Sequence, residues 1–399
     1  MDKEAERSRE LVAPLIAKLD KLAPELEEEI VGNEEEGRLS GRTMDLLREA
    51  RIPSLLISES LGGLGMFPRD ALEVLERIGR IDGSISWIGG IWGGTGLLLP
   101  YYEADVARQL LGGGDPLFGA SGAPSGRAVP VEGGFRLSGA WSYGSGDLHA
   151  DYVICTAVQL DSDGRPAKDP LGNPLLRLCT VRGSDIKPRG NWDTIGLRAT
   201  GSIDFAVEDV FVPHNLTFDL ARGPVSPDRQ QSGGFVLSLY LLHTPFALGA
   251  SRRLLDELTT FANQPNSRGV QLADNVVFRA EMARQEVAVR SARAYVYQVW
   301  DETDALLKAG RPLTRRNQTE LRAAMVHIHE VARDVAQFVF TKAGGTTLRA
   351  GGLQRWVRDT LSGCQHFIVQ DSVYPDVAWE LMGAPENVVW GPNGLVTIG

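Results

Sequence analysis

The feature that most constrains the fold of this chain is an apolar series near its C-terminal end. The intervals within the series are 3, 4, 3, 4 and 3 residues, and its members are Leu321, Ala324, Ile328, Val331, Val335 and Phe338. Such spacing places every member on one face of an α-helix. The helix is therefore predicted to bury that face against other helices of a bundle, and Gly344 and Gly345 are predicted to end it.

The whole sequence divides into three regions by its hydrophobic pattern. Residues 1–115 and 223–399 carry helical spacing, with further long helices expected at about 275–309 and 353–371. Residues 116–222 instead alternate short runs of β-forming residues with Gly-rich turns, which is typical of a small antiparallel barrel or sandwich. We therefore expect an α+β protein with an N-terminal helical domain, a central β domain and a C-terminal helical domain.

Composition excludes several classes of partner. The net charge is −10 and no run rich in Lys or Arg occurs, which argues against nucleic acid or an anionic membrane surface. The longest apolar stretch, Gly234–Ala250, contains His243 and is too short to span a bilayer. The charged first ten residues do not resemble a signal peptide. Reduced thiols in a cytoplasmic protein are expected, because no CxxC motif joins Cys155, Cys179 and Cys364.

Several catalytic motifs are missing from the sequence. No Gly-x-Gly-x-x-Gly follows a strand, and neither a phosphate-binding loop with Gly-Lys-Ser/Thr nor a Gly-x-Ser-x-Gly elbow is present. No Glu stands three residues before a His, as a di-iron bundle would need. His327 and His329 are two residues apart and point in different directions on a helix. They are interpreted as surface or core histidines, and no metal site is predicted.

A Gly-rich polar turn over Gly196–Ser202 runs directly into a strand-like segment that stops at Pro213. Glycine lets a backbone approach a ligand closely, because it has no Cβ and accepts unusual backbone angles. The turn is therefore expected to present backbone N–H groups and the hydroxyls of Thr200 and Ser202 to the flat, polar edge of a ligand.

Three further motifs precede this turn: Ile57–Gly65, Asp82–Trp87 and Gly139–Gly146. In this order and at this spacing, the four motifs resemble those of the acyl-CoA dehydrogenase superfamily, over about residues 40–385. The resemblance implies an N-terminal helical domain, a central antiparallel β-barrel or sandwich that forms a flavin wall, and a C-terminal four-helix bundle.

A segment near the C-terminal end resembles one subfamily. Leu353–Asp359 reads Leu-Gln-Arg-Trp-Val-Arg-Asp, and His366 follows seven residues after the Asp, which is similar to the two-component flavin monooxygenases. The Glu-Gly-Thr context of the acyl-CoA dehydrogenase base is absent, and Arg268 is followed by Gly-Val-Gln-Leu instead of x-x-Phe-Gly. Both departures favour a monooxygenase, and the second argues against a tightly held FAD.

The resemblance implies an enzyme that takes reduced FMN or FAD from a separate reductase. With O₂, this flavin would form a C4a-hydroperoxide that hydroxylates an aromatic or heteroaromatic small molecule. An acyl-CoA dehydrogenase or oxidase with bound FAD, an N- or S-oxygenase of the same fold, and a catalytically silent binding protein are the alternatives. By the same resemblance we expect a homotetramer or a dimer.

The resemblance also assigns roles to individual residues. His366 is the expected base for a substrate O–H or N–H, and Ser121 is the expected hydroxyl for the polar group of the substrate. The expected flavin contacts are Trp141, Ser145, Gly146, Thr200, Ser202 and Arg268, the last toward the cofactor of a neighbouring subunit. Each has a structural alternative, which is core packing for Trp141 and His366, turn formation for the small residues and a solvated loop for Arg268.

Overall fold

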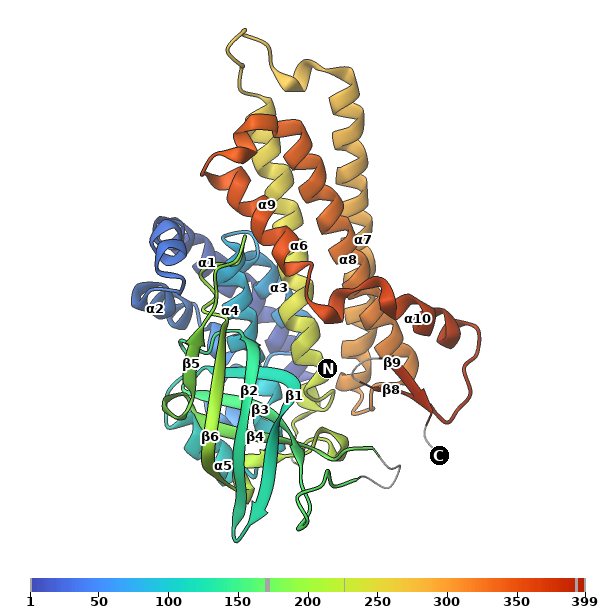
Figure 1. Ribbon diagram of the computed structural model, residues 1–399. Coiled ribbons are helices and arrows are strands. Elements are labelled where there is room, and N and C mark those ends of the chain that lie inside the picture. Colours follow the sequence, from blue (N-terminus) through green and yellow to red (C-terminus); the bar gives the residue numbers. More distant parts are fainter. Residues whose placement is uncertain (1, 169–172, 226, 392–393, 398–399) are drawn as a thin grey trace.

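The computed structural model describes residues 2–168, 173–225, 227–391 and 394–397, and Figure 1 shows a sheet beneath two groups of helices. The first group covers the start of the chain, as predicted. Its helices are α1 (Lys3–Glu36), α2 (Gly41–Glu49), α3 (Pro68–Ile78), α4 (Gly83–Gly93) and α5 (Ala104–Leu111).

Helix α4 lies at the centre of this group. The Asp82 carboxylate caps its first turn by accepting from the N–H groups of Ser84 and Ile85, at 2.9 and 3.0 Å. Nearly every residue of α4 is buried, because it packs against α3, α6, α9 and the start of strand β1. One of its buried side chains, Trp87, points toward the sheet.

The middle of the chain forms one seven-stranded sheet in the order β5-β6-β2-β1-β3-β4-β7. Its strands are β1 (Phe118–Val131), β2 (Gly134–Gly144), β3 (Tyr152–Gln159), β4 (Leu176–Arg182), β5 (Lys187–Gly190), β6 (Ile203–Pro213) and β7 (Thr217–Phe218). The expectation of an antiparallel β unit is wrong for one pair, because β1 and β3 run parallel. After the β1–β2 hairpin, residues 145–151 carry the chain back to the start of β1, on its other side.

Strand β1, which contains Ser121, forms from residues that local propensity alone would not assign to a strand. Its sequence, FGASGAPSGRAVPV, is rich in Gly, Ser and Pro, which are poor strand formers. The strand forms because β2 and β3 supply partners on both sides, with a register shift between Ser121 and Gly126. Tertiary pairing overrides local propensity here.

The second group contains α6 (Val236–Ala262), α7 (Val276–Lys308), α8 (Arg315–Ala343) and α9 (Gly352–Gly363), which pack against one another. The helix α10 (Tyr374–Leu381) and a hairpin of β8 (Val388–Gly391) and β9 (Gly394–Thr397) follow. The predicted apolar series on α8 is buried from Leu321 to Val335, and α8 ends before Gly344 as predicted.

The prediction of a helix over 353–371 is wrong in its second half. Helix α9 ends at Gly363, and His366 begins a separate short turn over Phe367–Val369. The Cβ of any other residue at position 363 would lie 2.2 Å from the Phe246 ring, so α6 crowds the chain where α9 ends. His366 therefore does not share a helical face with Asp359.

Two smaller expectations concern the cysteines and the membrane. All three cysteines are free and buried, as predicted. Cys155 and Cys179 face each other across β3 and β4. Among the described residues, no helix combines the length and the apolar character needed to cross a bilayer.

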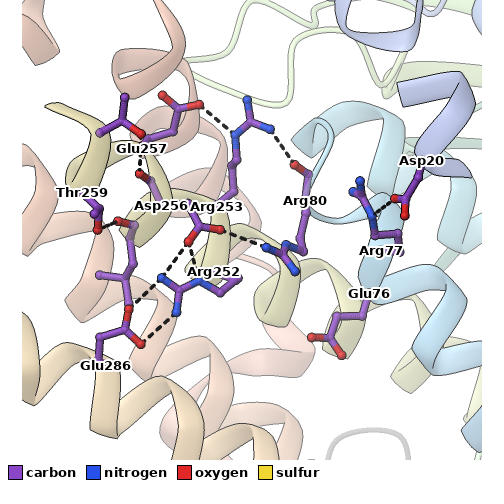
Figure 2. Close-up of polar contacts among 12 residues, drawn as sticks. Asp20, Glu76, Arg77, Arg80, Arg252, Arg253, Asp256, Glu257, Thr259 and Glu286 are labelled. Carbon is purple, nitrogen blue, oxygen red and sulfur yellow. Dashed lines mark hydrogen bonds and ion pairs between the residues drawn. The ribbon is translucent and has the colours of Figure 1, made fainter. Parts of the chain in front are cut away.

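Helices α3 and α6 meet at a pair of glycines. A Cβ on Gly249 would lie 2.3 Å from the backbone of Gly79, so the two helices touch backbone to backbone. Figure 2 shows the ionic contacts beside this point: Arg80 pairs with Asp256 at 3.0 Å, and Arg252 reaches both oxygens of Glu286 on α7. A bidentate arginine pair of this kind holds a defined geometry.

Helix α9 is fastened to the polar turn between β5 and β6. The Asp359 carboxylate accepts a hydrogen bond from the Leu197 N–H at 2.7 Å. A Cβ on Gly196 would lie 2.4 Å from the Arg358 carbonyl oxygen, so only glycine allows this approach. Leu197 itself has φ 53°, an unfavourable angle for its side chain. The contact with α9 therefore holds the turn in a conformation that the turn alone would not favour.

Asp359 is one of two neighbouring buried carboxyl groups. Asp82, which caps α4, lies close enough to raise the Asp359 pKa, and Arg355 approaches Asp82 at 3.7 Å. Burial first, and Asp82 second, raise the pKa of Asp359 to about 8. One negative charge shared between the two groups is therefore the favoured state near neutral pH.

We predict that Gly249→Ala lowers the free energy of unfolding by about 1–3 kcal/mol, because an extra methyl group overpacks the contact with Gly79. Urea denaturation followed by circular dichroism measures the change. Gly32→Ala is the matched control, because Gly32 is exposed on α1 with no atom near its added Cβ. The control should be neutral or stabilising, and an equal loss in both variants would contradict the prediction.

We predict that Asp359→Asn makes the stability less dependent on pH. The folded chain holds a proton on Asp359 that the unfolded chain releases above about pH 4, so stability falls as pH rises toward the folded pKa of about 8. The amide keeps an acceptor for Leu197 and does not titrate. Urea midpoints at pH 5 and pH 8 should differ less in the variant, whereas the exposed Asp163→Asn should leave the difference unchanged.

Candidate active site

A chain of hydroxyl groups links the turn before β6 to helix α4. The Ser202 hydroxyl donates to the Ser145 oxygen at 2.9 Å, and the Thr200 and Ser202 oxygens are 2.7 Å apart. The Trp87 indole N–H donates to the same Ser145 oxygen at 3.2 Å. Ser145 thus accepts two hydrogen bonds, and its own hydrogen is available to a ligand. Three predicted residues are brought together here.

These three hydroxyls differ in exposure. Thr200 and Ser202 are wholly buried, whereas Ser145 is half-buried. Gly146 adopts φ 80° and donates its N–H to the Thr200 carbonyl at 3.2 Å, which holds the two turns together. Ser145 is therefore the hydroxyl that can touch a ligand, and Thr200, Ser202 and Gly146 orient it.

Trp141 and Ser121 lie inside the sheet. Trp141 is buried, donates its N–H to the Thr156 carbonyl at 2.9 Å and stacks on Phe205 with centroids 5.4 Å apart. Ser121 is also buried and donates to the Ser142 carbonyl at 3.4 Å, although its neighbour Ala120 bridges to Ser145. The structure thus gives both side chains a packing role in the resting protein.

Arg268 lies far from these residues in the chain's own fold. It is exposed in the loop between α6 and α7, where its N–H donates to the Asn266 side chain at 2.9 Å. A cavity of about 690 Å³ lies near the same end of α6, and Phe261, Gln264 and Arg349 contribute to its lining. The Arg268 side chain is therefore free to reach a molecule outside this chain.

His366 lies beside Trp87 in an aromatic cluster. Its ring centroid is 6.1 Å from that of Trp87 and 4.3 Å from that of His243 on α6. His243 in turn lies 6.0 Å from His329 on α8 and 5.0 Å from Trp87. In the sequence, His243 stands out only as a polar residue within the apolar stretch Gly234–Ala250. That isolated polar residue in a buried helix was the available signal.

Burial makes these imidazoles neutral. It lowers the pKa of His366 to about 4 and that of His329 to about 4. The pKa of His243 is also lowered, by burial first and then by its histidine neighbours. Across the described ranges, no group of His, Cys, Asp and Glu side chains is arranged to hold a metal ion. The cluster can therefore accept a proton, but a proton on any ring is costly unless a partner stabilises it.

Exposed apolar side chains, called the apolar rim here, stand close in sequence to Ser145, to the Gly196–Ser202 turn and to His366. Tyr143 is 74% exposed, Ile195 is 68% exposed and Phe367 is 64% exposed. Tyr143 also adopts φ 59° and contacts Trp192 edge to face, with centroids 6.3 Å apart. A flat ring system with one polar edge would cover this apolar rim and meet the free Ser145 hydrogen. The residues present therefore suit an isoalloxazine ring.

Comparisons with known proteins identify relatives of this chain. The family described as acyl-CoA dehydrogenase, C-terminal domain, matches residues 241–371. An indole-3-acetate monooxygenase of Pseudomonas putida is 29% identical over 86% of this chain and 87% of its own. The oxygenase subunit HsaA, a flavin-dependent monooxygenase of Mycobacterium tuberculosis, is 30% identical over 50% of this chain and 49% of its own.

A solved structure has the same fold over almost the whole length of both chains. XiaF from a Streptomyces species, in complex with FADH2 and glycerol, superimposes with a TM-score of 0.88 and 22% identity, over 96% of this chain and 98% of its own. Residues 241–371 thus match the C-terminal domain of the acyl-CoA dehydrogenases, and relatives of the chain include flavin-dependent monooxygenases.

Proposed function

We propose that this chain is the oxygenase component of a two-component flavin-dependent monooxygenase that hydroxylates an aromatic or heteroaromatic small molecule. The observation that carries the proposal is the pairing of a free Ser145 hydroxyl with a neutral imidazole, His366, across the indole of Trp87. The Ser145 hydroxyl suits a reduced flavin, and the His366 imidazole suits an ionisable substrate. The names of the relatives support the same reaction class.

When bound, the reduced flavin supplies the two electrons that split O₂ between the substrate and water. Ser145 would hold the polar edge of the ring, and its partners Ser202 and Trp87 fix the direction of its hydroxyl. The apolar rim, made of Tyr143, Ile195 and Phe367, would exclude water from the ring. Exclusion of water favours transfer of oxygen to the substrate over loss of hydrogen peroxide.

The substrate would lie between the flavin position and His366. Trp87 supplies an aromatic wall there, and Phe246 packs behind Trp87 with centroids 5.4 Å apart. A neutral imidazole can take a proton from a substrate O–H or N–H, which makes the aromatic ring more electron-rich. Ser121 would reach the polar group of such a substrate only after its bond to Ser142 opens.

The distal part of the cofactor would involve a second copy of the chain. Arg268 is exposed, near the α6 end where the 690 Å³ cavity lies, so it would meet a phosphate group from a neighbouring subunit in a homotetramer or dimer. FAD would extend to that position and FMN would not. If Arg268→Ala loses affinity for FAD but keeps its affinity for FMN, the result would support FAD as the cofactor.

The proposed function is tested with the purified protein, NADH, a generic flavin reductase and a panel of phenols, indoles and aromatic thioethers. A mass gain of one oxygen in a panel member supports it. Failure with every member, together with reduction of bound FAD by an acyl-CoA, would instead identify an acyl-CoA dehydrogenase.

We predict that Ser145→Ala lowers the product formed per reduced flavin by at least about 10-fold, because a hydrogen-bond donor to the cofactor is lost. The rate of flavin oxidation should stay similar, and hydrogen peroxide should account for the missing product. Ser142→Ala is the matched control, since Ser142 is exposed on β2 just before Ser145. Unchanged peroxide release in Ser145→Ala would contradict the assignment.

We predict that His366→Ala lowers the rate of hydroxylation by roughly 10²–10⁴-fold, the usual contribution of a general base. Single-turnover product formation measures the effect, while flavin oxidation continues. The exposed His327 on α8 provides the control, as His327→Ala should behave like the unaltered protein. Equal product yield from His366→Ala would remove His366 from the reaction.

A further inference from the structure

His243 is buried without a polar partner. Its side chain is 0% exposed, and within the described residues neither ring nitrogen has a hydrogen-bond partner. An unpaired polar group in a protein interior is costly, and a phenylalanine ring would fill the same volume without that cost. The imidazole is retained beside Trp87, His366 and His329.

The orientation of His329 is set by the backbone of its own helix. Its Nδ1 lies 2.7 Å from the Met325 carbonyl oxygen. A carbonyl oxygen only accepts, so Nδ1 carries the hydrogen of this neutral ring. The Nε2 atom then has a free lone pair, and it has no partner in the described part of the chain. His329 therefore offers an acceptor on the side of His243.

His366 lacks the carboxylate that often supports a catalytic histidine. Within the described ranges, its side chain takes part in one hydrogen bond, which the Ile368 N–H donates to Nδ1 at 3.4 Å. Burial alone lowers its pKa to about 4. Because Nδ1 accepts from Ile368, the neutral ring carries its hydrogen on Nε2, and a proton taken from the substrate would go to Nδ1. A base so buried holds that second proton poorly unless a partner stabilises the charged ring.

We propose that His243 is a positioning residue for His366, because its free ring nitrogen accepts a hydrogen bond from His366 when that ring takes the substrate proton. The inference rests on the proposed function. The substrate O–H or N–H bond breaks, its electron pair stays on the substrate, and an N–H bond forms on His366. His243 then donates its own N–H to His329 Nε2, and His329 Nδ1–H already donates to Met325. No proton passes beyond His366.

The His243 and His366 rings are close enough for their nitrogens to meet by turns of the rings, whereas the His243 and His329 rings must also move closer by a small shift of the side chains. The His243 and His366 rings are tilted by 42° at 4.3 Å, and the His243 and His329 rings are tilted by 65° at 6.0 Å. In the resting structure both bonds are open. Rotation of the His243 ring about its side-chain bonds would bring its nitrogens toward both neighbours, because the ring lies between them.

Other charged or titratable groups face this cluster. From α8, Arg333 lowers the pKa of His329. After α9, Cys364 donates its thiol to the His329 carbonyl at 3.4 Å, and burial raises the pKa of that thiol to about 12. Helices α4 and α6 contribute Trp87 and Phe246, which carry no charge. None of these groups supplies a negative charge that would replace the role of His243.

The test uses the protein labelled with ¹⁵N in its six histidines, without flavin or substrate. Imidazole ¹⁵N shifts report each tautomer and titration. His243→Phe keeps the aromatic volume and removes both nitrogens. It should lower the proton affinity of His366 by about 10-fold, the usual worth of a hydrogen bond to a charged group. An unchanged titration of His366, or a hydrogen on Nε2 of His329, would overturn the proposal.

The same variants are then compared with a reductase, flavin and an accepted substrate. His243→Phe should keep flavin oxidation and lose about 10-fold in product, and His243→Gln, whose amide oxygen can accept, should recover part of it. Equal yields from the two variants would overturn the proposal. The exposed His327→Phe is the control, and melting temperatures establish that each variant folds.

The two hypotheses fail in different ways. If no substrate is hydroxylated but the ¹⁵N titration of His366 depends on His243, the proposed function fails and the pairing stands. If hydroxylation occurs and His243→Phe matches the unaltered protein in titration and yield, the pairing fails and the function stands.

Discussion

The site depends on the contact between α9 and the turn before β6. The Asp359 carboxylate holds the Leu197 N–H, and the Gly196 backbone lies directly against the Arg358 carbonyl. This contact joins helix α9 of the C-terminal group to the turn that leads into β6. Because Thr200 and Ser202 follow in the same turn, a displacement of α9 would move the hydroxyls that orient Ser145. The Arg-x-x-Arg-Asp motif therefore positions the turn of the site without being part of the site itself.

A second constraint is the burial of the region around His243 and His329, next to His366. Helices α4, α6 and α8 bring Trp87, His243 and His329 together, and burial keeps the imidazoles neutral. Exclusion of water suits transfer of an oxygen atom, yet it also weakens any base in the same place. The His243 imidazole next to His366 would allow both the exclusion of water and an effective base, since it offers a hydrogen bond without a permanent charge.

The motif residues predicted to contact a ligand occupy different surroundings in the structure. The motifs identified Ser145, Thr200 and Ser202, and the structure joins them in one chain of hydroxyls. Trp141 came from the same motif, and its ring is buried against Phe205 with its N–H on the Thr156 carbonyl. Its expected contact with the flavin stays a prediction.

The sequence alone determined the succession of helical and β regions, the burial of the apolar face of α8 and the position of the Gly196–Ser202 turn. These follow from local periodicity and from short motifs. Only the tertiary structure decided the parallel pairing of β1 with β3, the end of α9 before His366 and the meeting of His243 with His366. The partners in these contacts come from distant parts of the chain, or from crowding by another helix. No local pattern encodes such encounters, because they depend on how the helices and the sheet pack.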